Sequence, residues 1–229
     1  MRMASSGKRT TTARRRRRAG RPSGDDQDLR AHLLDAAIAQ FARAGIAATS
    51  LRAIATEAGV TPAMLHYYFG DKPRLVQALM DERLLPALLP LRAQLERVGN
   101  DPAALIESFV RGIGEVVARL PWFPSLWVRE VLCEGGALRE VLFNQAIPNL
   151  PQLLAQRFAM AQADGRLNAD IDPRLLVVSL VGLTLFPAAG APIWRRAFDA
   201  EGLGADVMLK HTLALLERGA GAAGRGDVA

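Results

Sequence analysis

The sequence has little cysteine and little histidine, and this limits the chemistry available to the protein. Among its 229 residues there are one cysteine and three histidines. Cys133 has no second cysteine with which to form an internal disulfide or a paired-cysteine metal site. We expect it to be a small buried apolar side chain rather than a redox sensor, because it lacks the basic neighbours that activate a thiol.

The sequence also lacks the motifs that mark common enzymes. His32, His66 and His211 fall on three different predicted helices, so no His-Glu-x-x-His metal motif is present, and no Gly-Lys-Ser/Thr phosphate loop occurs. We therefore expect no enzymatic activity, no metal and no cofactor. A helical enzyme without a recognisable catalytic motif remains an alternative.

A secretory leader is not apparent either. The N-terminal region lacks an apolar run followed by a small-residue cleavage site. We therefore expect the protein to be cytoplasmic.

Acidic residues are absent from the first 22 positions, which contain nine of the 29 lysines and arginines. The other residues have 20 bases against 23 acids, so the positive charge belongs to the N-terminal segment and not to the body. We expect residues 1–24 to be a disordered arm that binds DNA phosphates, and a merely solubilising extension is the alternative. The residues of the arm expected to contact DNA are Arg14, Arg15, Arg16, Arg17, Arg18 and Arg21.

No segment shows a convincing strand pattern, whereas helical periodicity is nearly continuous after residue 25. Half of the residues are apolar, which is enough for a substantial core. Residues 26–44 repeat apolar side chains at helical spacing, and Gly45 is the expected stop. The sequence therefore predicts an all-α fold.

Two shorter helices are predicted next. Ser50 is the expected cap of a helix over residues 51–58, and Gly59 and Val60 form a turn. Thr61 is the expected cap of a third helix that begins at Pro62 and ends near Phe69. Two short helices joined by a tight glycine-containing turn are typical of a helix-turn-helix.

The predicted third helix has two distinct faces. Leu65 lies at the centre of the inward face, whereas Ala63 and Tyr67 point the opposite way, with Met64 and His66 at their flanks. Small side chains at the start of this helix permit close approach to a phosphate backbone, and Tyr67 and His66 offer hydrogen bonds. Lys72 follows the helix and can add a phosphate contact.

The motif that spans these helices resembles the DNA-binding domain of the TetR family. The resemblance covers residues 33–79 and is strongest in LRAIATEAGVT (residues 51–61) and LHYYFGDK (residues 65–72). It implies an N-terminal three-helix domain with a helix-turn-helix, followed by a helical domain for ligand binding and dimerisation. The implied domains are residues 25–72, with the motif at about 50–69, and residues 73–219, and a disordered tail follows at 220–229.

The resemblance also implies roles for individual residues. Ser50 and Arg52 would contact the DNA backbone, and Lys72 matches the family's phosphate-binding lysine. The residues that would face the major groove are Thr61, Pro62, Ala63, His66 and Tyr67. The family often has Lys-Gly where this chain has Pro62-Ala63, and usually tyrosine where it has His66; the arginine arm offers a replacement for the missing lysine.

The predicted body after residue 72 is divided into about six helices by the ten prolines from Pro86 and Pro90 to Pro192, with Pro102 and Pro173 as starts and a last helix over residues 203–218. Residues 175–194 carry no charge, which is about the length of a membrane span. Pro187, Gly190 and Pro192 interrupt the second half of this segment, so a buried or interface helix is preferred over a membrane helix.

The family resemblance implies that the last two helices pair with those of a second copy, at about residues 174–187 and 203–218. A homodimer also follows from the small reach of one short recognition helix, because two-fold pairing lets two of them read half-sites about 34–36 Å apart. Ordinary intramolecular core is the alternative for these helices.

A small lipophilic effector is expected to bind among the aromatic side chains of the second domain. The candidates for its pocket are Phe109, Trp122, Phe123, Trp127, Phe143, Phe158 and Phe186, and plain core is the alternative for most of them. We expect the effector to change the tilt of the helix that starts near Asp71 and so the separation of the recognition helices.

These predictions together describe a sequence-specific transcriptional regulator, a repressor that a small apolar effector releases from a palindromic operator. A non-specific architectural DNA-binding protein that uses the arginine arm is the main alternative. Such a protein would show a steep salt dependence and almost no sequence preference.

Overall fold

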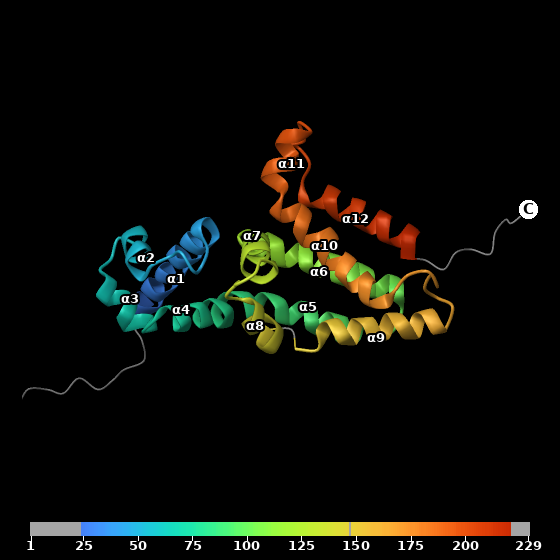
Figure 1. Cartoon of the computed structure of the whole chain (residues 1–229), viewed down its shortest axis with the longest axis horizontal. Coiled ribbons are helices and arrows are strands. Elements are labelled where there is room, and N and C mark those ends of the chain that lie inside the picture. Colours follow the sequence, from blue (N-terminus) through green and yellow to red (C-terminus); the bar gives the residue numbers. More distant parts are fainter. Residues whose placement is uncertain (1–23, 147, 221–229) are drawn as a thin grey trace, which may run out of the picture.

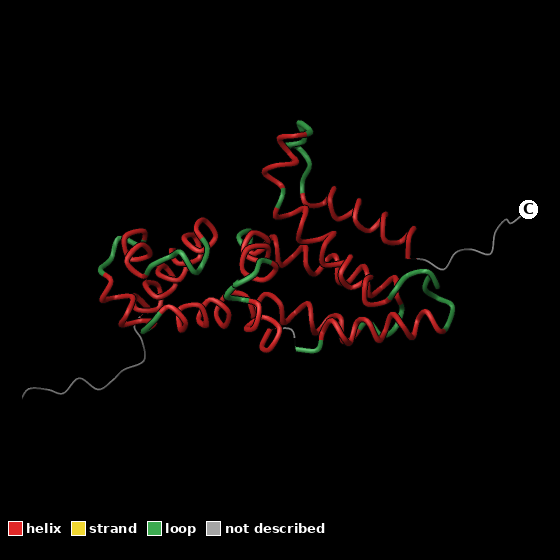
Figure 2. The backbone as a smooth tube through the Cα atoms, viewed as in Figure 1, coloured by secondary structure: helices red, strands yellow, loops and turns green. Residues whose placement is uncertain are grey.

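A computed structural model describes residues 24–146 and 148–220, and within them the chain is built of helices and connecting loops, with no β-strand (Figure 2). The three N-terminal helices form a small domain at one end of an elongated molecule, and the remaining helices form the larger body (Figure 1). The all-α fold predicted from the sequence is therefore confirmed.

The N-terminal domain consists of α1 (Gly24–Ala44), α2 (Leu51–Glu57) and α3 (Pro62–Phe69). The helical stripe of α1 supplies most of its core, and Ile54, Leu65 and Phe69 bury their side chains against it. Gly45 ends α1 with a φ of 85°, a conformation that glycine adopts without a steric penalty. The predicted bounds of the three helices are confirmed to within two residues.

Arg30 of α1 connects this domain to the helices that follow it. Its guanidinium lies 4.4 Å from the centre of the Phe69 ring, donates a hydrogen bond of 2.7 Å to the carbonyl oxygen of Tyr68, and pairs with Glu82 at 2.6 Å. Tyr68 in turn donates its hydroxyl proton to the carboxylate of Asp26. These contacts fix the C-terminal end of α3 against α1.

A long helical element leads from the N-terminal domain into the body. It consists of α4 (Lys72–Leu79), a π-helical turn η1 (Met80–Leu84) and α5 (Leu85–Arg97). The N–H of Leu85 donates to the carbonyl of Met80, five residues back, just before Pro86. Pro86 and Pro90 were expected to interrupt the helix, but Pro86 lies in the first turn of α5 and Pro90 inside it.

The body continues with shorter and longer helices that pack around α6. Gly112 lies where α5 crosses α6, and an added Cβ there would come 2.4 Å from Cδ1 of Leu91, so its lack of a side chain permits this close approach. The elements are α6 (Pro102–Arg119), α7 (Phe123–Trp127), η2 (Val128–Leu132), α8 (Arg139–Val141), η3 (Leu142–Ala146), α9 (Leu150–Ala163), α10 (Pro173–Ala189), α11 (Ala191–Ala197) and α12 (Ala205–Ala220). Pro102 and Pro173 begin α6 and α10, as predicted.

The uncharged segment at residues 175–194 forms two helices. The expectation that Pro187 breaks it was wrong, because α10 continues through Pro187 to Ala189. The chain turns at Gly190, and α11 projects from the body as a short arm (Figure 1). No single helix of the described residues is long and apolar enough to cross a membrane; α10 and α11 meet that condition only as a pair, across a bend of 71°.

Candidate nucleic-acid interface and effector cavity

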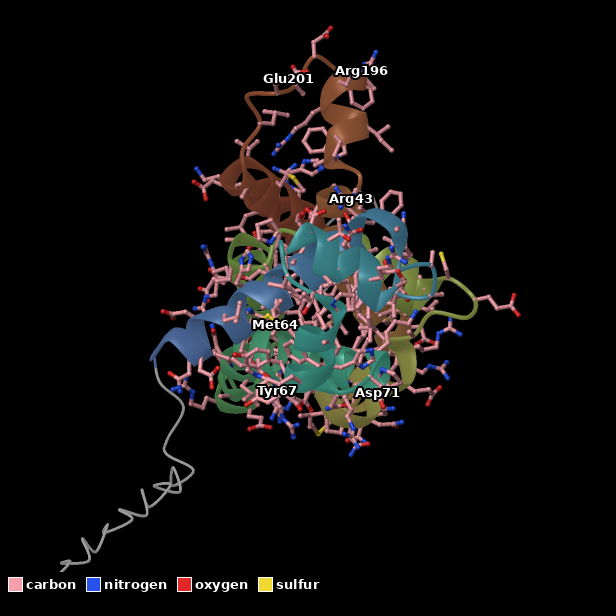
Figure 3. The ribbon with its side chains drawn as sticks, turned by 90° about the vertical axis from the view of Figure 1, so that its left-hand side faces the viewer. Arg43, Met64, Tyr67, Asp71, Arg196 and Glu201 are labelled. Atoms are coloured by element: carbon pink, nitrogen blue, oxygen red, sulfur yellow. The ribbon has the colours of Figure 1, made fainter. Side chains whose placement is uncertain are left out.

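The recognition helix α3 has one buried face and one exposed face. Leu65 and Phe69 are buried in the N-terminal domain, whereas the Tyr67 side chain is 78% exposed. Ala63 and His66 are also exposed, and Met64 is half-buried. Figure 3 shows Tyr67 and Met64 at the end of the molecule that faces the viewer. The predicted orientation of this helix is therefore confirmed.

The first turn of α3 is largely open to solvent. Thr61 has the extended backbone of an N-cap, but its side chain makes no capping hydrogen bond, contrary to expectation. Thr61 and Pro62, which the resemblance assigns to the major-groove face, are both exposed. The Nδ1 of His66 lies 2.5 Å from the carbonyl oxygen of Gly70, so one of its ring nitrogens is hydrogen-bonded to the C-terminal end of α3.

Helix α2 presents two of the residues that the resemblance assigns to the DNA backbone. Ser50 caps the helix as predicted, because its Oγ accepts a hydrogen bond of 3.1 Å from the N–H of Ala53. The capping bond uses a lone pair of the Ser50 oxygen, so the hydroxyl proton of Ser50 remains available to donate a hydrogen bond. Arg52 is exposed and forms no ion pair among the described residues.

Lys72 is not a free surface cation. Its Nζ donates hydrogen bonds to the carbonyl oxygens of Ile46 (2.8 Å), Ala47 (3.0 Å) and Thr49 (3.0 Å). An ammonium group has three donors, so all three of its protons are used within the protein. Lys72 therefore holds the loop that joins α1 to α2 in place, and the phosphate contact expected of it would require these bonds to open.

Arg74 is a candidate that the sequence pattern did not indicate. Its side chain lies against Gly70, where an ideal Cβ would be 3.3 Å from its Cδ and from its Nη1. It is exposed, and its guanidinium forms no ion pair or hydrogen bond among the described residues. Because the pattern pointed to Lys72, only the spatial position of Arg74 next to the end of α3 identifies it.

The arginine arm lies outside the described residues. This applies to all of its predicted contacts, which are Arg14, Arg15, Arg16, Arg17, Arg18 and Arg21.

The body encloses an apolar cavity of about 60 Å³ between α5, α6, α7, α9 and α10. Three of the aromatic residues predicted to form a pocket line it, namely Phe109, Phe123 and Trp127. The other lining residues are aliphatic or proline: Leu88, Leu91, Ile113, Leu142, Leu150, Pro151, Leu154, Val177, Val181 and Leu185. We refer to this space as the aromatic cavity.

The other four aromatic candidates do not line this cavity. Trp122 is half-buried and packs edge-on against Phe123, with ring centres 6.3 Å apart. Phe158 is completely buried in the core, whereas Phe143 and Phe186 are exposed. Sequence position alone did not separate these environments.

The junction between the two domains is held by a buried carboxylate. Glu130 is only 4% exposed, and its Oε1 accepts a hydrogen bond of 2.9 Å from the N–H of Ile46 in the α1–α2 loop. Its Oε2 accepts from the N–H of Ala137 at 3.1 Å, within the body. The neighbouring Arg129 donates to the carbonyl of Arg43 at 3.0 Å. No pattern in the sequence indicated this role for Glu130.

Cys133 follows this junction and is exposed, so the expectation of a buried thiol was wrong. The helix-like turn η2 ends just before it, which places Cys133 at the start of a surface loop. Groups of three or more metal-ligating side chains are absent from the described part of the chain.

Helices α10 and α12 each have a buried and an exposed apolar face. On α10 the exposed face carries Leu175, Val178 and Phe186 around the small residue Gly182. On α12 Leu213 and Leu216 are buried in the body, whereas Val207 and Leu215 are exposed. Each helix therefore uses only part of its apolar surface within the subunit.

Comparisons with known proteins agree with this arrangement. Residues 33–79 match the family model described as bacterial regulatory proteins, tetR family. The HTH-type transcriptional regulator RutR of Escherichia coli O157:H7 is 32% identical over 163 residues, which is 70% of this chain and 74% of RutR. The HTH-type transcriptional repressor Rv3405c of Mycobacterium tuberculosis is 29% identical over 182 residues, 79% of this chain and 82% of that protein.

Solved structures show the same fold at lower identity. The ketosteroid transcriptional regulator KstR2 of Mycobacterium tuberculosis superposes with a TM-score of 0.68 at 20% identity, covering 88% of this chain and 99% of KstR2. NalD of Pseudomonas aeruginosa, a repressor of a multidrug efflux pump, gives 0.59 at 23% identity and covers 85% and 97%. The second helix of the helix-turn-helix is exposed, as DNA binding requires, and the relatives match over most of their length. The chain therefore belongs to the TetR family of bacterial regulatory proteins.

Proposed function

We propose that this regulator is a homodimeric repressor that binds a two-fold symmetric operator and leaves it when a small apolar molecule binds the body. The observation that carries the proposal is the exposed face of α3, on which Tyr67 projects while Leu65 and Phe69 anchor the helix. The Tyr67 ring touches Tyr68 edge-on, with ring centres 5.2 Å apart, but most of its side chain faces solvent, where it is available for contact with DNA.

The contacts to DNA divide into reading and positioning. Ala63, Met64, His66 and Tyr67 face the major groove and are placed to contact base edges. Ser50, Arg52 and Arg74 surround this face and provide hydrogen bonds and charge to phosphates, which orient the helix without reading sequence. The arginine arm adds further phosphate contacts.

Dimerisation uses the exposed apolar faces of α10 and α12. Leu175, Val178 and Phe186 on α10 and Leu215 on α12 are each more than half exposed in the single subunit. Large apolar side chains in such a stripe are typical of a helix that packs on a partner, and Gly182 between them lets two helix backbones approach closely. Four such helices from two subunits form a bundle.

The effector signal reaches the DNA-binding domain through the Glu130 junction. Trp127 lines the aromatic cavity at the end of α7, and η2 with Glu130 follows it directly in the chain. A ligand that enlarges the cavity displaces α7 and the carboxylate that holds Ile46. The α1–α2 loop and the Lys72 contacts at the start of α4 then move together, which changes the tilt of α4 and the separation of the recognition helices.

The proposal is tested by selecting bound sequences from random duplex DNA with the full-length protein. We expect an inverted repeat with half-site centres one helical turn apart, because two recognition helices related by a two-fold axis read adjacent major grooves. The Tyr67→Ala variant should bind the selected operator at least about tenfold more weakly and keep the same circular dichroism spectrum. Enrichment of no sequence would favour the architectural alternative.

Release is tested with the selected operator and a panel of lipophilic compounds in a fluorescence-anisotropy titration. An effector should raise the operator Kd of the intact protein by about tenfold or more, which is the usual range of coupling between two sites. Gln152 is exposed on α9, and the Gln152→Ala variant serves as a control that should respond to the effector as the native protein does. If no compound in a broad panel changes operator affinity, the induction part of the proposal fails.

A further inference from the structure

A second cavity lies between α6, α10, α11 and α12, at the base of the projecting arm. Its volume is about 320 Å³, which is within the range of small-molecule sites and several times that of the aromatic cavity. The apolar lining includes Val110, Ile113, Gly114, Val117, Ala118, Pro121, Pro124, Leu183, Ala188, Ala191, Ala205, Met208 and Leu209. Thr184, Thr212 and Arg195 are its three polar residues.

Arg195 is the only charged residue in that lining. Among the described residues it forms no ion pair, and its guanidinium makes one hydrogen bond, from Nη2 to the carbonyl oxygen of Leu203 at 2.9 Å. Its Nε is buried without a hydrogen-bond partner. A guanidinium has five N–H donors, and a buried donor without a partner costs free energy that most proteins avoid.

The hydroxyls of the two threonines both face carbonyl oxygens of α10. The hydroxyl of Thr184 donates to the carbonyl oxygen of Leu180 at 2.7 Å, and that of Thr212 donates to the carbonyl oxygen of Leu183 at 3.4 Å. The guanidinium is the one charged donor in the lining, and it makes only one hydrogen bond. It is also held in place, because its Cζ lies 5.4 Å from the centre of the Trp194 ring, and Trp194 Nε1 donates to the carbonyl oxygen of Pro187 at 2.8 Å.

From this combination we propose that the cavity binds a small lipophilic carboxylate, with its carboxylate on Arg195 and its hydrocarbon part against α6 and α12. A carboxylate accepts two parallel hydrogen bonds from a guanidinium, and the absence of any acid in the lining leaves the positive charge unopposed. A cation would be repelled there, and a neutral hydrocarbon would leave the donors of Arg195 unpaired.

The second cavity is distinct from the aromatic cavity but adjacent to it. Ile113 of α6 lines both, so a ligand on the Arg195 side would press against the same helix wall that encloses the aromatic side chains. The proposed binding of a carboxylate depends only on the lining of the second cavity. Only a consequence for operator affinity would rest on the proposed function.

The experiment measures binding of octanoate, octan-1-ol and octylammonium to the full-length protein by isothermal titration calorimetry, without DNA. We expect octanoate to bind at least about tenfold more tightly than octan-1-ol, because a hydrogen bond to a charged group contributes more than one to a neutral group. Octylammonium should not bind measurably at the same concentrations. Equal affinity for octanoate and octan-1-ol would overturn the proposal.

Three variants locate the site. Arg195→Leu should weaken octanoate binding by about tenfold or more and leave octan-1-ol unchanged, whereas Arg196→Leu, the exposed neighbour on α11, should change neither. Gly114→Leu should block both ligands, because the leucine side chain would fill the cavity. The substitution should not disturb α6, because a Cβ at Gly114 meets no atom within 4 Å and leucine is a better helix former than glycine. Octanoate binding that survives both Arg195→Leu and Gly114→Leu would place the ligand elsewhere.

Operator binding by the same samples separates the two proposals. If octanoate binds through Arg195 but no operator is found, the cavity proposal stands and the repressor proposal fails. If an operator is found but octanoate and octan-1-ol bind equally, the reverse holds.

Discussion

Lys72 and Arg74 lie two residues apart at the start of α4 but have different surroundings. The ammonium of Lys72 is shared among three carbonyl oxygens of the α1–α2 loop, whereas the guanidinium of Arg74 lies exposed against Gly70. The first arrangement supports the fold of the DNA-binding domain, and the second leaves a charge available to a phosphate. The two residues therefore make a matched pair for substitution.

We expect Lys72→Ala to lower the free energy of unfolding by about 1–3 kcal/mol, because three carbonyl oxygens lose a charged donor. Arg74→Ala should leave stability within about 0.5 kcal/mol and reduce the slope of log K against log salt by about 1 for each phosphate that Arg74 binds. Urea unfolding and salt-dependent operator binding measure these effects. An unchanged stability in Lys72→Ala would contradict the structural role.

Tyr68 illustrates how a residue next to the reading face serves the fold. Its hydroxyl donates to the carboxylate of Asp26, and this bond, with desolvation and the negative charge of Asp26, raises the pKa of Tyr68 to about 12 from the ordinary value of 10. The neutral hydroxyl is thus the stabilised form. The stabilisation is fully present below about pH 10 and is lost as the pH rises through the folded-state pKa.

The chain has only two tyrosines, so Tyr67→Phe leaves Tyr68 as the sole phenol to titrate. That background removes the small contribution of the Tyr67 charge, so the ultraviolet absorbance of tyrosinate should rise with a midpoint well above pH 10, and Asp26→Ala should lower the midpoint toward 10. A midpoint near 10 in the variant that retains Asp26 would show that the Asp26 contact is not formed in solution.

At the scale of elements, η2 and the α1–α2 loop are coupled through one buried side chain. Glu130→Gln keeps the shape but removes the charge and places an amide N–H beside one of the two backbone donors that the carboxylate accepts from. We expect a loss of about 1–3 kcal/mol in stability and faster hydrogen exchange at the Ile46 amide. The control is Glu134→Gln, an exposed acid in the next loop, which should change neither.

Helix α10 is the element on which dimerisation is expected to depend. A Cβ added at Gly182 meets no atom within 4 Å in the subunit, and arginine is a better helix former than glycine. Gly182→Arg should therefore fold normally and sediment as a monomer, whereas Ala93→Arg on the exposed side of α5 should remain a dimer. A dimeric Gly182→Arg protein would mean that the subunits pair through another surface.

At the scale of the whole molecule, charge and shape are divided between the ends. The residues after position 22 carry 20 bases against 23 acids, so the body has no excess of positive charge with which to attract DNA from a distance. The recognition helix lies at one end of the elongated molecule, and the arm formed by α11 projects from the body (Figure 1). Figure 3 shows Arg196 of α11 and Glu201 of the loop that follows it at the top of the molecule, away from Met64 and Tyr67.

Deleting residues 1–22 removes nine basic side chains from each subunit. We expect the truncated protein to bind its operator more weakly at low salt and with a flatter salt dependence, but to prefer the same sequence, because phosphate contacts position and base contacts specify. Anisotropy titrations over a range of salt concentrations, with operator and with scrambled DNA, provide the measurement. An identical salt slope after deletion would make the arm irrelevant to DNA binding.

The sequence by itself determined the three helices of the N-terminal domain and the two faces of α3. Apolar periodicity, Ser50 at the cap of α2, and Gly45 after α1 are local signals, and each depends on residues within a few positions of one another. For the same reason the motif at residues 51–72 was sufficient to place Tyr67 outward and Leu65 inward. The error at Pro187 shows the limit, since this proline lies inside the last turn of α10, and the carbonyl of Leu183 that it leaves without an N–H partner faces the hydroxyl of Thr212 on α12.

Only the tertiary structure decided how side chains far apart in the sequence are used. Lys72 and Arg74 are both cationic, and Phe109 and Phe158 are both aromatic, yet only Lys72 and Phe109 face a partner or a cavity that distant segments create. The same holds for Glu130, which meets Ile46 84 positions away, and for Arg195, whose cavity is enclosed by four helices. Burial, hydrogen-bond partners and cavities depend on how whole helices pack together, and this packing cannot be read from a local sequence pattern.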